Sequence, residues 1–311
     1  MFPAFLATVL FSLSVVFASR ATRALGGTTA NFCRLCVSAA LLAVWSHTVG
    51  RGFGGGAFGL FFLSGCIGFG MGDIALYQAL PRVGPRLTIM LVHCLSAPLA
   101  AITEWLWMGT GLTLAQIVSG LVILVGVAIA LAPREHLHIP PKVLAAGIAF
   151  GVVAALGQGG GAVISRKAYA VAETAGNEVR SLTFGLTATY QRILGGLIFA
   201  ALPSLWIMKK NRVKNRTSNS AAREEADERN GKQPAWLWVV LNALAGPTIG
   251  VGCFQWALST TKSGVVLAMV ATTPIVVIPF AFLFERDRPG SRSLLGGLVA
   301  VGGAIALTLV R

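Results

Sequence analysis

A few ionisable side chains fall inside long apolar runs, and these are the residues whose chemistry is informative. Asp73 follows a stretch with glycine at alternate positions and has no charged neighbour in sequence. A carboxyl group within an apolar segment is costly unless it faces water or a partner. Asp73 could therefore bind a cationic group or carry a proton, and the alternative is a structural pair with Arg34 or His93. His93 could be a titrating partner near neutral pH or a hydrogen-bonded core histidine.

Two arginines, Arg34 and Arg192, also lie in apolar runs. Guanidinium groups bind carboxylates and phosphates through paired hydrogen bonds. Arg34 lies near the end of its run, so its side chain could instead reach the membrane interface. Arg192 lies deeper and is the stronger candidate for an internal cavity. Other polar or aromatic residues that could line a path are Tyr190, Gln191, Gln78, Gln158, Gln255 and Trp256.

The sequence lacks the motifs of an enzyme, a metal site or a nucleotide site. The four histidines do not form the paired His/Asp cluster that a lipid-processing membrane enzyme would need. The glycines at 157, 159, 160 and 161 follow no strand and lack the Gly-Lys-Ser/Thr ending of a phosphate-binding loop. The five cysteines lie in apolar runs, where we expect small buried side chains rather than disulfides. We predict no catalytic residue, no metal and no cofactor.

The composition indicates which elements position these side chains. Only 12% of the 311 residues are charged and the mean hydropathy is +0.75, whereas soluble domains carry about 25% charged residues. The net charge of +14 alone would suit a nucleic-acid partner, but water does not hold such long apolar runs. A soluble enzyme, a nucleic-acid-binding module and a disordered chain are excluded. We predict a multi-pass protein of the cell membrane, or of the inner membrane where there are two, with the lipid bilayer as partner.

Ten runs are long enough to cross about 30 Å of hydrocarbon, and lipid requires them to be helices. They cover residues 2–19, 29–46, 57–80, 84–107, 113–132, 143–164, 182–207, 236–258, 264–284 and 293–310. The residues at 81–85 read as a turn between two spans. The charged segment 209–235 has no apolar core to bury, so we expect a flexible, solvated loop.

The order of features repeats along the chain. In each half, an apolar helix carries a proline and then a glutamate six residues later: Pro98 and Glu104, then Pro279 and Glu285. We interpret the glutamates as structural anchors at helix ends, and the prolines as kinks that could act as gates.

Five spans in each half place the second half upside down relative to the first. The predicted fold is therefore an all-α membrane protein with two inverted five-helix repeats, 1–132 and 143–311. This architecture is typical of transporters, with a site between the repeats.

On these residues, the chain resembles the EamA-type members of the drug/metabolite transporter superfamily. The resemblance is carried by Ala97-Pro98-Leu99 with Glu104, by Thr273-Pro274-Ile275 with Glu285, and by the glycine-rich helices that follow each glutamate. It implies ten helices in two five-helix repeats and both termini in the cytoplasm. Counting Lys and Arg in the connections favours termini outside, because the charged loop dominates the count. The orientation stays open.

The leading hypothesis is a secondary transporter that exports a small polar or amphipathic metabolite by alternating access. Protons could be coupled to transport through Asp73. The alternative is a non-transporting scaffold that binds a partner through the loop 209–233. Because ten helices with an internal repeat can form a complete path in one chain, we favour a monomer.

Overall fold

The structure is a computed structural model that describes residues 1–131, 139–215, 234–285 and 291–309. Within these ranges the regular structure is helical and contains no strand. In this described part of the chain, seven helical segments are long and apolar enough to cross a membrane: Phe2–Thr22, Thr29–Thr48, Phe58–Leu76, Leu87–Met108, Pro141–Thr174, Ala235–Thr260 and Ser263–Phe280. Leu114–Ala130 and Leu294–Leu309 are shorter apolar helices. The predicted all-α class is confirmed.

The first half of the chain contains five α-helices and one π-helical segment. They are α1 (Phe2–Leu25), α2 (Gly27–Thr48), α3 (Phe58–Gly65), η1 (Cys66–Gly72), α4 (Asp73–Met108) and α5 (Leu114–Leu131). The second half contains α6 (Pro141–Thr174), α7 (Leu182–Asn215), α9 (Ala235–Ala243), η2 (Leu244–Thr248), α10 (Ile249–Thr260), α11 (Ser263–Val270), α12 (Thr273–Glu285) and α13 (Ser291–Leu309). The two π-helical segments, η1 and η2, continue directly from the α-helices before them.

The predicted turn at 81–85 is wrong, because helical hydrogen bonding continues through it within α4. Residues 64–72 nevertheless run antiparallel to α6, and residues 83–100 run parallel to it, as their close approaches to the glycines of α6 show. The chain therefore reverses in a helical corner rather than in a loop. Arg82 supports this corner, since its Nη1 donates to the carbonyl oxygen of Gln78 at 2.6 Å.

Two other boundaries also differ from the prediction. α6 continues to Thr174 and α7 to Asn215, each well past the expected end of its span. The added stretches, 165–174 and 208–215, contain no glycine or proline that would end a helix. The charged segment expected from residue 209 therefore begins as helix. Residues 216–233, where the predicted loop and the docking alternative fall, lie outside the described residues.

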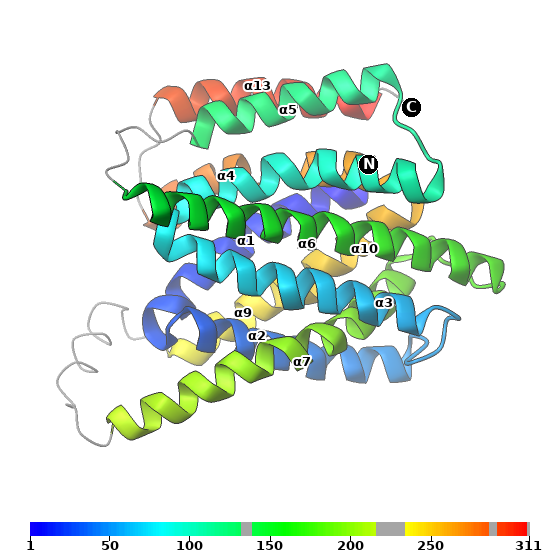
Figure 1. Cartoon of the computed structure of the whole chain (residues 1–311). Helices are drawn as coiled ribbons and strands as arrows, with labels where there is room; N and C mark the ends of the chain where they lie inside the picture. The colour runs from blue at the N-terminus through cyan, green and yellow to red at the C-terminus, as the bar shows by residue number, and fades with distance from the viewer. Residues whose placement is uncertain (132–138, 216–233, 286–290, 310–311) are drawn as a thin grey trace.

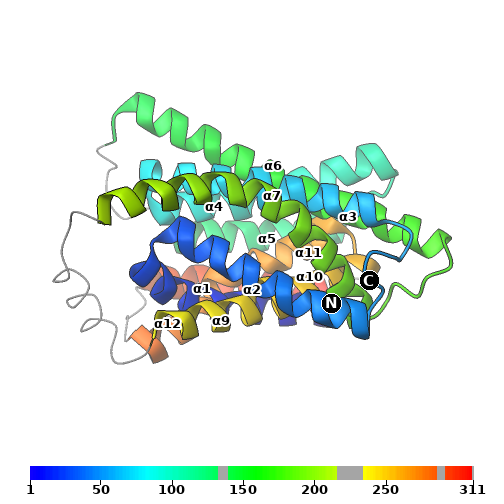
Figure 2. The ribbon, with the colours of Figure 1, turned by 90° about the horizontal axis from the view of Figure 1, so that it is seen from below.

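Helices from the two halves pack against one another throughout the bundle. α5 lies beside α13 at one edge, α4 packs along α6, and α2 along α7 (Figures 1 and 2). α1 packs on α9 and α10, and α6 packs correspondingly on α3 and η1. These particular contacts are thus preserved when the helices of one half are exchanged with those of the other in chain order.

Small residues allow the closest of these contacts, as is common in membranes. A Cβ added to Gly296 of α13 would lie 2.5 Å from the carbonyl oxygen of Gly126 of α5. A Cβ added to Gly157 of α6 would lie 2.6 Å from Cα of Gly72 in η1. At both crossings the two backbones are in contact, and no larger residue fits without displacing one helix.

The expected span 264–284 is interrupted at Ala271 and Thr272, between α11 and α12. Pro274 explains the position, because proline lacks an N–H and is accommodated in the first turn of a helix. Threonine hydroxyls bind two carbonyl groups at the interruption: Thr272 to Met269 at 2.7 Å, and Thr273 to Val270 at 2.6 Å. Pro98 and Pro279 lie inside α4 and α12, so the kinks expected there stay predictions.

Candidate functional site

A cavity of about 350 Å³ lies between helices of the two halves. This volume is at the lower end of the range of about 300–1,000 Å³ for small-molecule sites. Its lining includes four ionisable residues and one amide that the sequence singled out: Arg34, Asp73, His93, Arg192 and Gln158. We call this the central cavity.

The two π-helical segments form part of its wall. η1 contributes Gly68 and Gly72, and η2 contributes Gly246 and Pro247. π-Helical segments are rare and occur frequently at functional sites. A Cβ added to Gly68 would lie 3.0 Å from Nη2 of Arg192, so a glycine at this position leaves room for the guanidinium group.

Arg192 is the most buried charged residue of the central cavity, with 5% of its surface exposed. Its Nη1 donates to Oγ of Ser165 at 2.8 Å, and the Ser165 hydroxyl lies 2.8 Å from that of Ser64. The guanidinium carbon lies 5.4 Å from the ring centre of Phe69. Nε of Arg192 is buried and has no hydrogen-bond partner. Within the described ranges no carboxylate forms an ion pair with Arg192.

Asp73 begins α4 directly after η1, and Oδ2 of its carboxyl group is buried without a hydrogen-bond partner. Nδ1 of His93 is likewise buried and unpartnered. Nε of Arg34 donates to Oδ1 of Asn31 at 2.7 Å. Arg34 attracts the Asp73 carboxylate electrostatically, but the hydrogen-bonded pair of Asp73 with Arg34 or His93 is not formed in the described structure.

Five other residues that the sequence singled out lie outside the lining of this cavity. The amide of Gln191 donates to the carbonyl oxygens of Gly52 and Gly54, both at 2.9 Å, and so fixes the loop before α3. Gln78 accepts from Arg82 at the helical corner. The hydroxyl of Tyr190 lies 3.4 Å from the His47 ring.

The last two of these residues lie next to each other on α10. The indole of Trp256 donates to the carbonyl oxygen of Arg180 at 3.2 Å and ties α10 to the segment before α7. Gln255 is fully buried, and both of its amide atoms lack hydrogen-bond partners. Helical spacing could not exclude these residues from the cavity, because the side of each helix that faces it depends on the crossing of the two halves.

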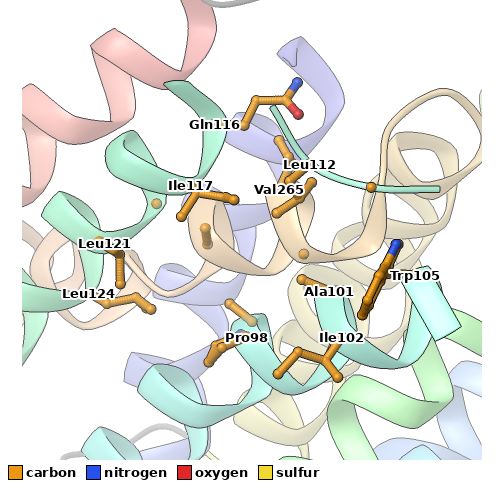
Figure 3. A pocket seen from close by; sticks show the side chains of 15 residues that line it. Pro98, Ala101, Ile102, Trp105, Leu112, Gln116, Ile117, Leu121, Leu124 and Val265 are labelled. Carbon is orange, nitrogen blue, oxygen red and sulfur yellow. The ribbon is translucent and has the colours of Figure 1, made fainter. Parts of the chain in front are cut away.

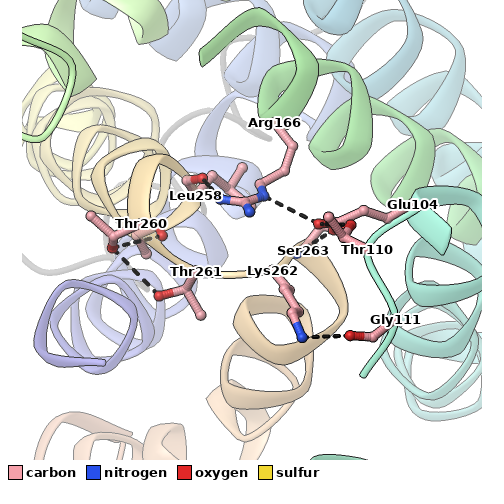
Figure 4. Close-up of polar contacts among 10 residues, drawn as sticks. Glu104, Thr110, Gly111, Arg166, Leu258, Thr260, Thr261, Lys262 and Ser263 are labelled. Atoms are coloured by element: carbon pink, nitrogen blue, oxygen red, sulfur yellow. Dashed lines mark hydrogen bonds and ion pairs between the residues drawn. The ribbon is translucent and has the colours of Figure 1, made fainter. Parts of the chain in front are cut away.

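Glu104, at the end of α4, binds the second half of the chain (Figure 4). Oε2 accepts from the backbone N of Ser263 at 2.6 Å and also from the Ser263 hydroxyl. Oε1 accepts from Nε of Arg166 at 3.2 Å and from the Thr110 hydroxyl at 3.0 Å. Lys262 donates to the carbonyl oxygen of Gly111 beside this network. The repeat-related Glu285 ends α12, and its side chain lies outside the described part of the structure.

A second cavity, of about 390 Å³, lies between α4, α5 and α11 (Figure 3). Pro98, Ile102, Trp105 and Leu121 line it, and none of its lining residues is ionisable. It has no charged group that could pair with a charged solute, so the central cavity is the better candidate for a polar ligand.

Several residues of the central cavity were not found from the sequence. Phe11 and Phe254 line it from α1 and α10, Thr273 from the start of α12, and Ser165 holds Arg192. Aromatic and hydroxyl residues are common in membrane helices, so their types alone gave no signal. The Thr273-Pro274 pair, which begins α12 in mid-span, is the one local signal that could have pointed to this site.

Apolar helices around an internal cavity with ionisable groups define a multi-pass membrane protein. The sequence matches the EamA-like transporter family over residues 1–132 and 145–309. The chain therefore belongs to the EamA-like transporter family, which is a family of membrane transporters. The predicted family is confirmed.

One solved structure, titled only "Crystal structure of protein", is similar to this chain with a TM-score of 0.72. The match covers 99% of this chain and 96% of that chain at 17% sequence identity. At this identity the likeness shows a shared fold alone. No curated protein matches the chain.

Proposed function

We propose that this protein is a secondary transporter that exports a small polar or amphipathic metabolite by alternating access through the central cavity. The carrying observation is that one cavity is lined by buried ionisable residues and by a π-helical segment from each half of the chain. A binding site between two repeats that move relative to each other is the expected arrangement in such transporters.

The exchange pattern of the helix contacts supports an inverted repeat. α5 with α13, and α2 with α7, are pairs of corresponding helices, and the contacts of α1 with α9 and α10 correspond to those of α6 with α3 and η1. The described residues contain seven long apolar segments and two shorter ones, and the proposal takes α7 as the tenth span.

Asp73 is the candidate for proton coupling. Its carboxyl oxygen Oδ2 faces no hydrogen-bond donor of the described chain, so it can take a proton without breaking a protein contact. His93 lines the same cavity and is the candidate second proton carrier. Substrate and proton would then compete for, or share, one site.

The test is flux into proteoliposomes that contain the purified full-length chain. A set of anionic, zwitterionic, neutral and cationic metabolites is offered with and without a pH gradient. We expect saturable flux of at least one solute, and Asp73→Asn should abolish its acceleration by the gradient. Glu173→Gln is the matched control, because Glu173 lies at the surface and pairs only with Arg180.

Two results would contradict the proposal. The first is an absence of saturable flux for every solute, from protein that a thermal unfolding transition shows to be folded. That result would remove the transport function. Gradient-dependent flux that is unchanged in Asp73→Asn would leave transport in place and remove Asp73 from proton coupling.

A further inference from the structure

The charges of the central cavity are unbalanced in a way that points to its ligand. Its described lining carries two guanidinium groups, from Arg34 and Arg192, against the single carboxylate of Asp73. One acid against two bases leaves one guanidinium group in excess. Arg192 is buried and forms no ion pair with a carboxylate of the described residues, and an unpaired buried charge is costly.

The free donors of Arg192 lie on one edge of its guanidinium group. Nη1 is occupied by Ser165, whereas Nε has no partner and Nη2 forms no hydrogen bond in the described structure. Nε and Nη2 are the two nitrogens that bind both oxygens of a carboxylate or phosphate side by side. Ser165 on one side and the Phe69 ring on the other hold the group in place.

We propose that the transported substrate carries an anionic oxygen group, a carboxylate or a phosphate, that binds the Nε–Nη2 edge of Arg192. This inference rests on the proposed transport function and names the class of substrate. The rest of the substrate lies among apolar side chains, since Phe11, Leu76, Ile89 and Phe254 line the same cavity. The cavity volume of about 350 Å³ limits it to the size of a small metabolite.

The test compares four probes that share one ring and differ in charge: benzoate, phenyl phosphate, benzamide and benzylamine. Each is titrated into the purified full-length chain in detergent, and thermal unfolding is followed by tryptophan fluorescence. We expect saturable stabilisation by benzoate or phenyl phosphate, and none by benzamide or benzylamine at equal concentration. Whichever of the two anions binds more tightly tells carboxylate from phosphate.

Variants of Arg192 connect this stabilisation to the site. Arg192→Gln should weaken the binding of the anion by about 10- to 100-fold, because hydrogen bonds to charged groups contribute about 1.5–3 kcal/mol. Arg192→Lys should retain part of the affinity, since it keeps the charge but loses the paired geometry.

Gly68→Ala provides a second route that leaves Arg192 in the chain. Its Cβ would lie 3.0 Å from Nη2 of Arg192 and displace the guanidinium edge, so anion affinity should fall. Gly59→Ala is the matched control, because a Cβ there has no other atom within 4 Å.

The inference is overturned if neither anion stabilises the protein, if benzamide or benzylamine does so equally, or if Arg192→Gln and Gly68→Ala both leave anion binding unchanged. The flux assay separates this from the transport proposal. An anion that binds through Arg192 but never crosses the membrane refutes transport and leaves recognition intact. Saturable flux of neutral or cationic solutes alone supports transport and refutes the recognition of an anion by Arg192.

Discussion

Glu104 holds the two halves of the bundle together at one end, and neutralising it should destabilise the protein strongly. Glu104 is buried, with 1% of the residue surface exposed. Its carboxylate accepts four hydrogen bonds, two of them from Ser263. In Glu104→Gln the new NH₂ group cannot accept, so the donors at one of the two oxygens lose their acceptor. Arg166 also loses its counter-ion. Breaking a buried charge pair from one side costs about 3–5 kcal/mol.

The assay is equilibrium unfolding in mixed micelles with increasing SDS, followed by tryptophan fluorescence. Glu173→Gln is the control. The N–O distance of the Glu173–Arg180 pair, 3.1 Å, is close to the 3.2 Å of the Glu104–Arg166 pair, but its two side chains are 52% and 68% exposed. An exposed pair contributes about 0–1 kcal/mol. Equal losses of unfolding free energy in the two variants would refute the reasoning.

A double variant separates the ion pair from the rest of the Glu104 network. Arg166→Met removes the charge that Glu104→Gln leaves unpaired, so the double variant should lose less stability than the sum of the single variants. Coupling between contacting residues is about 0.5–3 kcal/mol. Strict additivity would show that Glu104 acts through Ser263 and Thr110 alone.

Three further changes test the packing and the helix ends. Gly296→Ala should lower the unfolding free energy by about 1–3 kcal/mol, because its Cβ would lie 2.5 Å from the carbonyl oxygen of Gly126. The control variant Gly302→Ala should not lower it, because a Cβ there meets nothing within 4 Å. Equal stability of the two variants would contradict the α5–α13 contact. Gly109→Ala should cost about 1–2 kcal/mol at the end of α4 from its φ of 70° alone, and an unchanged unfolding midpoint would argue against this backbone conformation. Thr272→Val should cost at most about 1 kcal/mol, since it removes the hydroxyl's hydrogen bond to the Met269 carbonyl, which still accepts from the Thr272 backbone N–H. The same SDS titration measures this, and no loss would mean that the hydroxyl does not stabilise the interruption.

The sequence predicted the fold class and the central ionisable residues because both follow from local rules. A carboxyl group such as Asp73 stands out in an apolar run whatever the tertiary structure is. The interruption before Pro274 and the helical corner at 81–85 were missed, because proline is compatible both with a turn and with the first turn of a helix. Whether such a proline lies in a turn or in the first turn of a helix depends on the hydrogen bonds of the neighbouring backbone groups.

The partners of the candidate residues could not be predicted from the sequence. Arg192 binds Ser165, and Glu104 binds Ser263 and Arg166, across sequence separations that no periodicity reveals. The sequence offers Gln191 as a residue that could line a path, and in the structure its amide binds the loop carbonyls of Gly52 and Gly54. Such assignments depend on which helices cross, and the crossing is fixed by glycine contacts between the two halves.

We propose that the cavity lies on a path that opens to each side of the membrane in turn. The most direct measurement places a cysteine at Val251, which lines the cavity, in a chain whose five native cysteines are replaced. Membrane-impermeant maleimides are applied from either side of oriented proteoliposomes. We expect labelling from both sides, slowed by a solute that the protein transports, and loss of flux after labelling. Labelling from one side only, with flux unchanged, would contradict it.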